Sequence, residues 1–435
     1  MINIELKDIK EFSRIYNANP ENKEIERKIT KQGLEKACMK EEIIKDNPAI
    51  FNIELSETKR YHQKESLRCW IFAGFNMIKR NMSKNLNMDI MDFELSDNFI
   101  AFFHRLEKTN TVYESIIDAK TTDLNKIAKK KILENPVRET GNWQLFINIV
   151  RKYGLVPLQV MPSSVEGENC NNIENLYTET VRKNVIELVE LKRQGKSREE
   201  IRKVKKKMLA ENYEFLSKVY GEPKQVFDYE YVDKTGNSVK LKNMTPVKFV
   251  DKFLTIDIQN FIFISNVPQW NRTYGQKIKN LATTNIKNIK GTEFLHISSE
   301  ELKELAVKQL KDDIPVNVGI SLQKFANKKL GILDTSLYNY EELIKYKKLK
   351  KEEGISFNDI NLHHWMTITG VYLDKNNKPT RWKVEDSYGE KERIKGYYVM
   401  NDNYFTDYVF TVIIHKKYLS EKQLKLYHQK AIIEK

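Results

Sequence analysis

One predicted helix that begins with a cysteine constrains this chain more than any other feature. Cys69 follows the mostly polar segment 63–68, and the spacing of the apolar residues after it predicts a buried helix: Trp70, Ile71, Phe72, Phe75, Met77 and Ile78. A thiol at a helix N-terminus lies near the positive end of the helix dipole, which favours the reactive thiolate. Gln63 lies six residues upstream, where its amide can reach the same space. A nucleophile beside a neutral donor suits acyl-group chemistry.

The same segment also fits a helix with a purely structural role. Free cysteine is among the most buried residue types, and the pair Cys69-Trp70 on an apolar helix is typical of a protein core. The catalytic interpretation therefore depends on partners elsewhere in the chain.

Such partners occur in a predicted β-hairpin near the C-terminus. Residues 363–372 are rich in β-branched and aromatic side chains, residues 376–379 have turn chemistry, and residues 381–389 form a second strand candidate. This hairpin places His364 at the start of one strand and Asp386 at the end of the next. An imidazole and the group that orients it can thus face a thiol held elsewhere. The structural alternative is a half-buried His364 bonded to the backbone.

A metal centre is not expected. His363 and His364 are adjacent on a strand, so their side chains point to opposite faces and cannot readily chelate one ion. The sequence has no His-Glu-x-x-His or Cys-x-x-Cys spacing, and we expect neither a metal nor another cofactor.

Taken together, these motifs resemble the bleomycin hydrolase / aminopeptidase C family, a branch of the papain-like cysteine peptidases. Gln63 matches its oxyanion glutamine, and Arg68-Cys69-Trp70 matches its nucleophile motif. His364-Trp365-Met366 with Thr369-Gly370-Val371 matches its His-Ala-Met…Thr-Gly-Val pattern. Trp382-Lys383-Val384-Glu385-Asp386-Ser387-Tyr388-Gly389 matches its Trp-Lys-Val-Glu-Asn-Ser-Trp-Gly. Further matches keep the family order over nearly the whole chain, among them residues 16–20, 94–96, 153–157 and 331–334.

The resemblance implies a cysteine-type aminopeptidase that hydrolyses peptides and amino-acid amides. Cys69 would be the nucleophile, His364 the acid and base, and Gln63 an oxyanion donor. Asp386 stands where the family carries asparagine, and Tyr388 stands where it carries tryptophan. A carboxylate at 386 would orient the imidazole and also stabilise the imidazolium.

The resemblance also bears on specificity and assembly. The sequence ends at residues 431–435 without the family's Pro-Trp-Asp-containing arm, which in the family confines the enzyme to substrate N-termini. We therefore expect mixed endo- and aminopeptidase activity as an alternative. The family further implies a homo-oligomer, a hexamer whose active sites face an inner channel.

Charge raises a different hypothesis. The chain carries 74 Lys and Arg against 60 Asp and Glu, a net charge of +14. Much of the excess lies in residues 192–207, which with the apolar residues from Val185 onward predict one long amphipathic helix with a solvated basic face. Family members can bind nucleic acid non-specifically through basic cavities, so nucleic acid is a candidate partner. The sequence has no zinc-finger, RRM-like or helix-turn-helix signature.

Location follows from cysteine use and hydropathy. Cys38, Cys69 and Cys170 form an odd, sparse set that argues against disulfides and for the cytoplasm. No apolar run approaches the ~20 residues of a membrane span, and residues 1–14 do not resemble a signal peptide. We expect no membrane association.

We predict an α+β fold with a papain-like division into two subdomains. Residues 1–435 would form one peptidase domain. Its expected parts are an N-terminal extension (1–60), a helical half with the nucleophile (61–170), a helical insertion (171–226) and a β-rich half with His364 and Asp386 (227–435).

Two rival functions stay open. A Cys-His-Asp acyltransferase of the transglutaminase type would suit Asp386, although Gln63 and Arg68-Cys69-Trp70 argue against it. The non-enzymatic rival is a basic, nucleic-acid-binding oligomer with a degraded active site.

Overall fold

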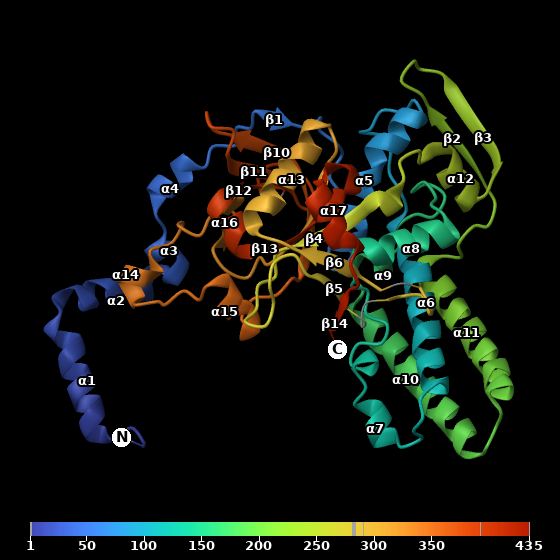
Figure 1. Cartoon of the computed structure of the whole chain (residues 1–435), viewed down its shortest axis with the longest axis horizontal. Helices are drawn as coiled ribbons and strands as arrows, with labels where there is room; N and C mark the ends of the chain where they lie inside the picture. The colour runs from blue at the N-terminus through green and yellow to red at the C-terminus, as the bar shows by residue number, and fades with distance from the viewer. Residues whose placement is uncertain (1, 281–283, 290, 392, 435) are drawn as a thin grey trace.

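The computed structural model describes residues 2–280, 284–289, 291–391 and 393–434. It has an α+β architecture in which helices gather on one side of the molecule and a large mixed sheet on the other (Figure 1). Two separate clusters of buried apolar side chains underlie these two parts.

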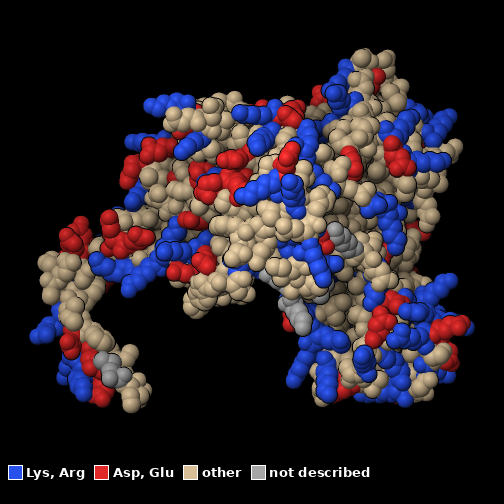
Figure 2. Space-filling view, viewed as in Figure 1, with Lys and Arg blue, Asp and Glu red and all other residues tan. Residues whose placement is uncertain are grey.

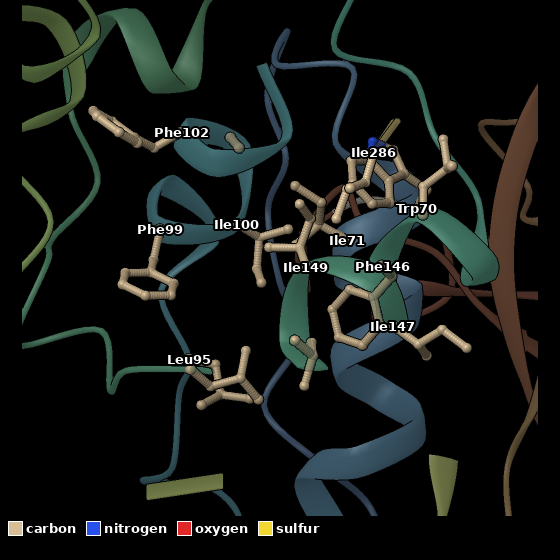
Figure 3. Packing of buried hydrophobic residues seen from close by; sticks show 14 of the residues in the cluster. Trp70, Ile71, Leu95, Phe99, Ile100, Phe102, Phe146, Ile147, Ile149 and Ile286 are labelled. Atoms are coloured by element: carbon tan, nitrogen blue, oxygen red, sulfur yellow. The ribbon is translucent and has the colours of Figure 1, made fainter. Parts of the chain in front are cut away.

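Helix α5 (Cys69–Asn85) is the central element of the helical part. Most of its residues are buried, and it packs against α6 (Asp97–Ile117) and α8 (Trp143–Tyr153) on one side and strand β10 on the other. Figure 3 shows Trp70 and Ile71 of α5 among apolar side chains of α6 and α8. The predicted buried helix beginning at Cys69 is therefore confirmed.

Helices α10 (Asn171–Arg193) and α11 (Arg198–Tyr220) pack along α6, and the prediction of one long helix across this segment was wrong. The chain turns at Gly195, whose φ of +74° suits glycine, and Ser197 then caps α11 through a capping box. Gly195 therefore separates two helices that both reach the long helix α6.

The basic face of this segment is largely used within the protein. Arg202 and Lys205 both form ion pairs with Glu114 of α6, and Lys192 donates to carbonyl oxygens at the C-terminal end of α6. On the face drawn in Figure 2, both basic and acidic side chains lie over this part of the molecule.

The main sheet contains twelve described strands and carries the predicted hairpin. At its centre β10 (His364–Leu373) pairs with β7 (Val316–Ile320) and with β11 (Pro379–Glu385), all antiparallel. Thr367 lies opposite Glu385, so the register brings Asp386 toward the start of β10. The hairpin is therefore confirmed. The other strands are β1 (Ile53–Glu54), β4 (Phe261–Ser265), β5 (Lys277–Asn280), β6 (Glu293–His296), β8 (Ala326–Asn327), β9 (Ile332–Leu333), β12 (Tyr397–Asn401), β13 (Val409–His415) and β14 (Ile432–Glu434).

Helices α13 (Ser299–Lys311) and α16 (Asp402–Tyr408) pack on this sheet and close the second core. The remaining short helices lie at its periphery or link longer elements. They are α7 (Leu124–Ala128), α9 (Val165–Glu168), α12 (Pro246–Phe253), α14 (Tyr340–Ile344), α15 (Lys351–Ser356) and α17 (Glu421–His428), with 3-10 turns at Lys131–Leu133, Ile258–Asn260 and Lys416–Tyr418.

Residues 227–253 differ from the expected division of the chain. Strands β2 (Phe227–Val232) and β3 (Ser238–Met244) form their own two-stranded sheet, and with α12 they bury Phe227, Tyr229 and Phe249 in the core of the helical part. Alternating burial along β2 is typical of a strand, but the core that it covers is not the one expected.

At the N-terminal end, helices α1 (Leu6–Ala18) and α2 (Pro20–Gln32) leave the body of the molecule as an arm (Figure 1). The next helices, α3 (Leu34–Cys38) and α4 (Glu41–Asp46), pack against the second core through Cys38, Ile43 and Ile44. The apolar residues Leu6, Ile9, Phe12 and Ile15 of α1 are exposed and follow a three-residue spacing, so they form one stripe. None of the described helices has both the length and the apolar content needed to cross a membrane.

Candidate active site

The structure places Cys69 at the first residue of α5, as predicted. The residue is buried, with 8% of its surface exposed, and it lines a cleft of about 620 Å³. Backbone N–H groups in the first turn of a helix have no partner within that helix, so this position combines a positive dipole end with free donors. His364 and Gln63 line the same cleft.

His364 lies between Cys69 and Asp386. Its Nε2 is 2.8 Å from Oδ1 of Asp386, so Nδ1 is the ring nitrogen that serves the thiol. Burial alone would lower the pKa of His364, but the Asp386 carboxylate and the charge and hydrogen bond of Cys69 raise it to about 10. Despite its own burial, Asp386 has a pKa below the ordinary value because it faces His364. The arrangement favours a charged imidazolium next to the sulfur.

Asp386 is held by groups beyond the histidine. The backbone N–H of Ser387 donates to Oδ1 of Asp386 at 2.8 Å, and Nε of Arg393 lies 3.4 Å from Oδ2. The Arg393 guanidinium also lies over the rings of Tyr388 and Tyr398. Sequence reasoning missed Arg393, because only the turn after β11 brings it back to Asp386.

Gln63 is oriented by the segment that follows β11. The Ser387 hydroxyl donates to Oε1 of Gln63 at 2.6 Å, and the Gln63 backbone N–H donates to the Ser387 carbonyl, also at 2.6 Å. These two bonds fix the amide so that Nε2 faces Tyr388, whose hydroxyl is 3.4 Å away. The Tyr388 ring lies against His364, with centroids 6.1 Å apart. Tyrosine therefore covers the imidazole where the resembled family has tryptophan.

A network of buried charges begins at Arg68, the residue before the cysteine. Its guanidinium contacts Glu139 and Asp97 at 2.6 Å, and Glu139 also binds Arg105 of α6 at 2.8 Å. Although burial works against its charge, Arg68 and Arg105 hold the pKa of Glu139 below its ordinary value. The sequence motif had singled out Arg68, but nothing in it identified Glu139 or Arg105 as its neighbours.

The cleft is also lined by Arg138, by residues 140–142 and by Lys108 of α6. Nε1 of Trp70 donates to the Glu139 carbonyl at 2.8 Å, and a Cβ on Gly141 would lie 2.5 Å from the Trp70 ring. Only glycine allows this approach of backbone to indole. Neither Lys108 nor Arg138 was expected at the cleft from sequence.

Both ring nitrogens of His363 lie near backbone groups: Nε2 accepts from the Leu322 N–H at 3.4 Å. Its Nδ1 is 3.2 Å from the Asn361 carbonyl oxygen, and burial lowers its pKa. Within the described ranges, the structure contains no group of three or more His, Cys, Asp or Glu residues arranged to hold a metal ion.

Comparisons with known proteins agree with this architecture. The chain matches the Peptidase C1-like family over residues 3–434. It is 32% identical to Aminopeptidase G of Lactobacillus delbrueckii subsp. lactis, covering 97% of this chain and 95% of that protein. It is 30% identical to Aminopeptidase C of Listeria monocytogenes serovar 1/2a, covering 98% and 95%. The crystal structure of PepW from Lactobacillus rhamnosis HN001 superposes with a TM-score of 0.92 at 30% identity, covering 98% of this chain and 95% of that one.

Proposed function

The chain belongs to the Peptidase C1-like family, and we propose that it is a cysteine-type aminopeptidase that cleaves peptides and amino-acid amides through a thioester on Cys69. The observation that carries this proposal is a group of three side chains at one cleft: Cys69 at a helix N-terminus, His364 in the same cleft, and Asp386 hydrogen-bonded to His364. The names of the aminopeptidase relatives support the substrate class.

The proposed reaction uses each of these groups in turn. The Cys69 thiolate attacks the scissile carbonyl carbon, and the Gln63 amide and the Cys69 backbone N–H stabilise the oxyanion, each donor contributing about 3 kcal/mol. His364 then gives its proton to the leaving amine, and the acyl group stays on sulfur. A water molecule that loses its proton to His364 attacks the thioester, which releases the acid and restores the thiol.

Asp386 stabilises the charged imidazolium of His364 more strongly than an asparagine at this position would. Its carboxylate is buried and charged, whereas an amide would orient the ring through a neutral oxygen. We infer that it keeps the thiolate–imidazolium pair populated to higher pH.

A broader specificity is the alternative, and one observation favours it. Among the described residues that line the cleft, none is an aspartate or glutamate that could pair with a substrate α-ammonium group.

Fluorogenic aminoacyl and peptidyl amides test the proposal, each offered with a free and with an acetylated N-terminus under reducing conditions. We expect turnover that Cys69→Ala abolishes. Cleavage of only the free-amine set would make the enzyme an aminopeptidase, and cleavage of both sets would establish the broader alternative. Absence of turnover of either set by a folded parent protein would refute the peptidase proposal.

An added amine acceptor separates hydrolysis from acyl transfer. A transglutaminase-type enzyme would form the new amide, whereas we expect only the free acid in mass spectra of the products. Nucleic-acid binding gains no support from the segment that suggested it, since Lys192, Arg202 and Lys205 are engaged with α6.

We also propose that the chain forms a homo-oligomer in the cytoplasm. The exposed apolar stripe of α1 borders a groove of about 580 Å³ between α1, α2 and α14, which a second copy of the chain could fill. The three free cysteines suit a reducing compartment. Light scattering after gel filtration tests the assembly: Phe12→Ser with Ile15→Asn should lower the mass of the particle, and an unchanged mass would exclude this surface.

A further inference from the structure

We propose that Lys108 and Arg138 form a cationic subsite that selects substrates bearing a carboxylate side chain on the acyl side of the scissile bond. The inference deepens the proposed peptidase function and rests on it. It starts from the composition of the cleft: its described lining holds these two cations and no acidic residue.

The segment that carries Arg138 and binds Lys108 is fixed in place. Nζ of Lys108 donates to the Arg138 carbonyl at 2.6 Å, and a guanidinium nitrogen of Arg105 donates to the Val137 carbonyl at 3.1 Å. The indole of Trp70 binds the next carbonyl, that of Glu139. Three side chains from α5 and α6 thus hold the backbone of residues 137–139, which fixes the ammonium group of Lys108 and the point from which the Arg138 side chain extends.

The two cations are available to a ligand in different ways. Arg138 is exposed at the edge of the cleft, whereas Lys108 is half-buried and uses one donor on the backbone. Burial and the neighbouring Arg105 lower the pKa of Lys108 to about 8, although Glu174 and Glu139 act in the opposite direction. Both carboxylates already pair with Arg105, and no carboxylate within salt-bridge distance of Nζ of Lys108 is found among the described residues. A substrate carboxylate would supply that counter-charge. By contrast, Glu139 is already shared by Arg68 and Arg105.

The position of His364 determines which part of the substrate lies near these two cations. His364 must reach the leaving amine, so the leaving group lies on the side of the cleft where Tyr388 packs against His364. Arg138 and residues 140–142 line the part of the cleft that the helical part forms, beside Trp70. The acyl portion of the substrate therefore faces Lys108 and Arg138, and glutamate or aspartate there would be favoured over the neutral amides.

Matched peptidyl-coumarin amides test this directly, because the leaving group stays constant. In each pair, one of the two residues before the coumarin is glutamate in the first peptide and glutamine in the second, and the rest of the peptide is the same. In the parent protein we expect kcat/KM to be about fivefold to tenfold higher for the glutamate peptide than for the glutamine peptide. This is the size of effect that two partly exposed charge pairs can give. Lys108→Met and Arg138→Gln should each bring this ratio closer to one. In Arg138→Glu, we expect kcat/KM to be higher for a peptide with lysine at this position than for the peptide with glutamate.

Lys206→Gln is the matched control, since it removes one positive charge at an exposed position of α11 outside the cleft. It should leave the ratio unchanged. A parent ratio near one, or a ratio that Lys108→Met and Arg138→Gln do not alter, would overturn the subsite. If Lys108→Met does not fold, the exposed Arg138 still provides the test.

Binding to Cys69→Ala separates this inference from the proposed function. Calorimetry with the same glutamate and glutamine peptides should show tighter binding of glutamate, and added salt should weaken that preference. A glutamate preference in binding without any turnover in the parent would refute the peptidase proposal alone. Turnover without a glutamate preference would refute only the subsite.

Discussion

The helical part and the sheet hold their halves of the candidate site by different physical means. Cys69 is placed by a helix whose preceding residue, Arg68, joins a buried cluster of charges with Glu139 and Arg105. His364 is placed by backbone pairing within the sheet, and one carboxylate, Asp386, sets its protonation. Losing a charge in the first region leaves others buried and unpaired, whereas the sheet register does not depend on Asp386. Substitutions should therefore cost stability in the helical part and change chemistry in the sheet.

The largest effect should come from breaking the charge cluster. Glu139→Gln leaves Arg68 and Arg105 without their shared counter-charge in the core, and we expect the free energy of unfolding to fall by about 3–5 kcal/mol. Chemical denaturation measures it. Glu199→Gln, which removes an exposed pair with Lys203 on α11, should cost no more than about 0.5 kcal/mol. Equal losses of unfolding free energy in the two variants would contradict the expected difference between the buried charge cluster and an exposed ion pair.

Asp386→Asn should change the pH profile. With the carboxylate, the pKa of His364 is about 10, so the imidazolium persists to alkaline pH. An amide removes that attraction and lowers the pKa, so the alkaline limb of kcat/KM should move to lower pH by about one unit or more. Superimposable profiles would refute the assigned role of Asp386.

The same substitution has a pH-dependent effect on stability. Because the pKa of His364 is raised above its unfolded value of about 6.5, the ion pair stabilises the folded state fully below about pH 6.5. That contribution is lost as pH rises toward about 10. The stability difference between parent and Asp386→Asn should therefore shrink over this interval, as denaturation at several pH values would measure. A constant difference would contradict the pairing.

A smaller effect should separate the two neighbours of Gln63. Ser387→Ala removes the 2.6 Å bond that fixes the amide, so kcat/KM should fall roughly tenfold as the donor loses its orientation. Tyr388→Phe keeps the ring over His364 and loses only a 3.4 Å contact, so a change within about twofold is expected. A larger loss in Tyr388→Phe would show that its hydroxyl, and not Ser387, orients the donor.

Local patterns predicted the elements that carry the candidate site. The apolar spacing after Cys69 predicted α5, and the turn at residues 376–379 between two β-rich runs predicted the hairpin of His364 and Asp386. Both predictions depend on periodicity within about twenty residues, which side-chain burial imposes directly on sequence. The same reasoning failed at Gly195, where one glycine ended a helix whose charge pattern continued beyond it.

Partners distant in sequence could not be predicted in this way. Residues 227–253 have the pattern of strands, but nothing in that pattern shows which core they cover. Likewise, Arg393 has no spacing relation to Asp386, and Lys108 has none to Arg138.

The sequence by itself predicted the candidate residues for thiol chemistry and determined the elements that present them, because a helix or a hairpin is specified by side chains close together in the chain. Only the tertiary structure decided what surrounds them: the charges behind Arg68, the hydroxyl that orients Gln63 and the cations in the cleft wall. These contacts join residues up to 324 positions apart, as Ser387 and Gln63 are. Their positions follow from how two cores pack, and that packing depends on the whole chain at once.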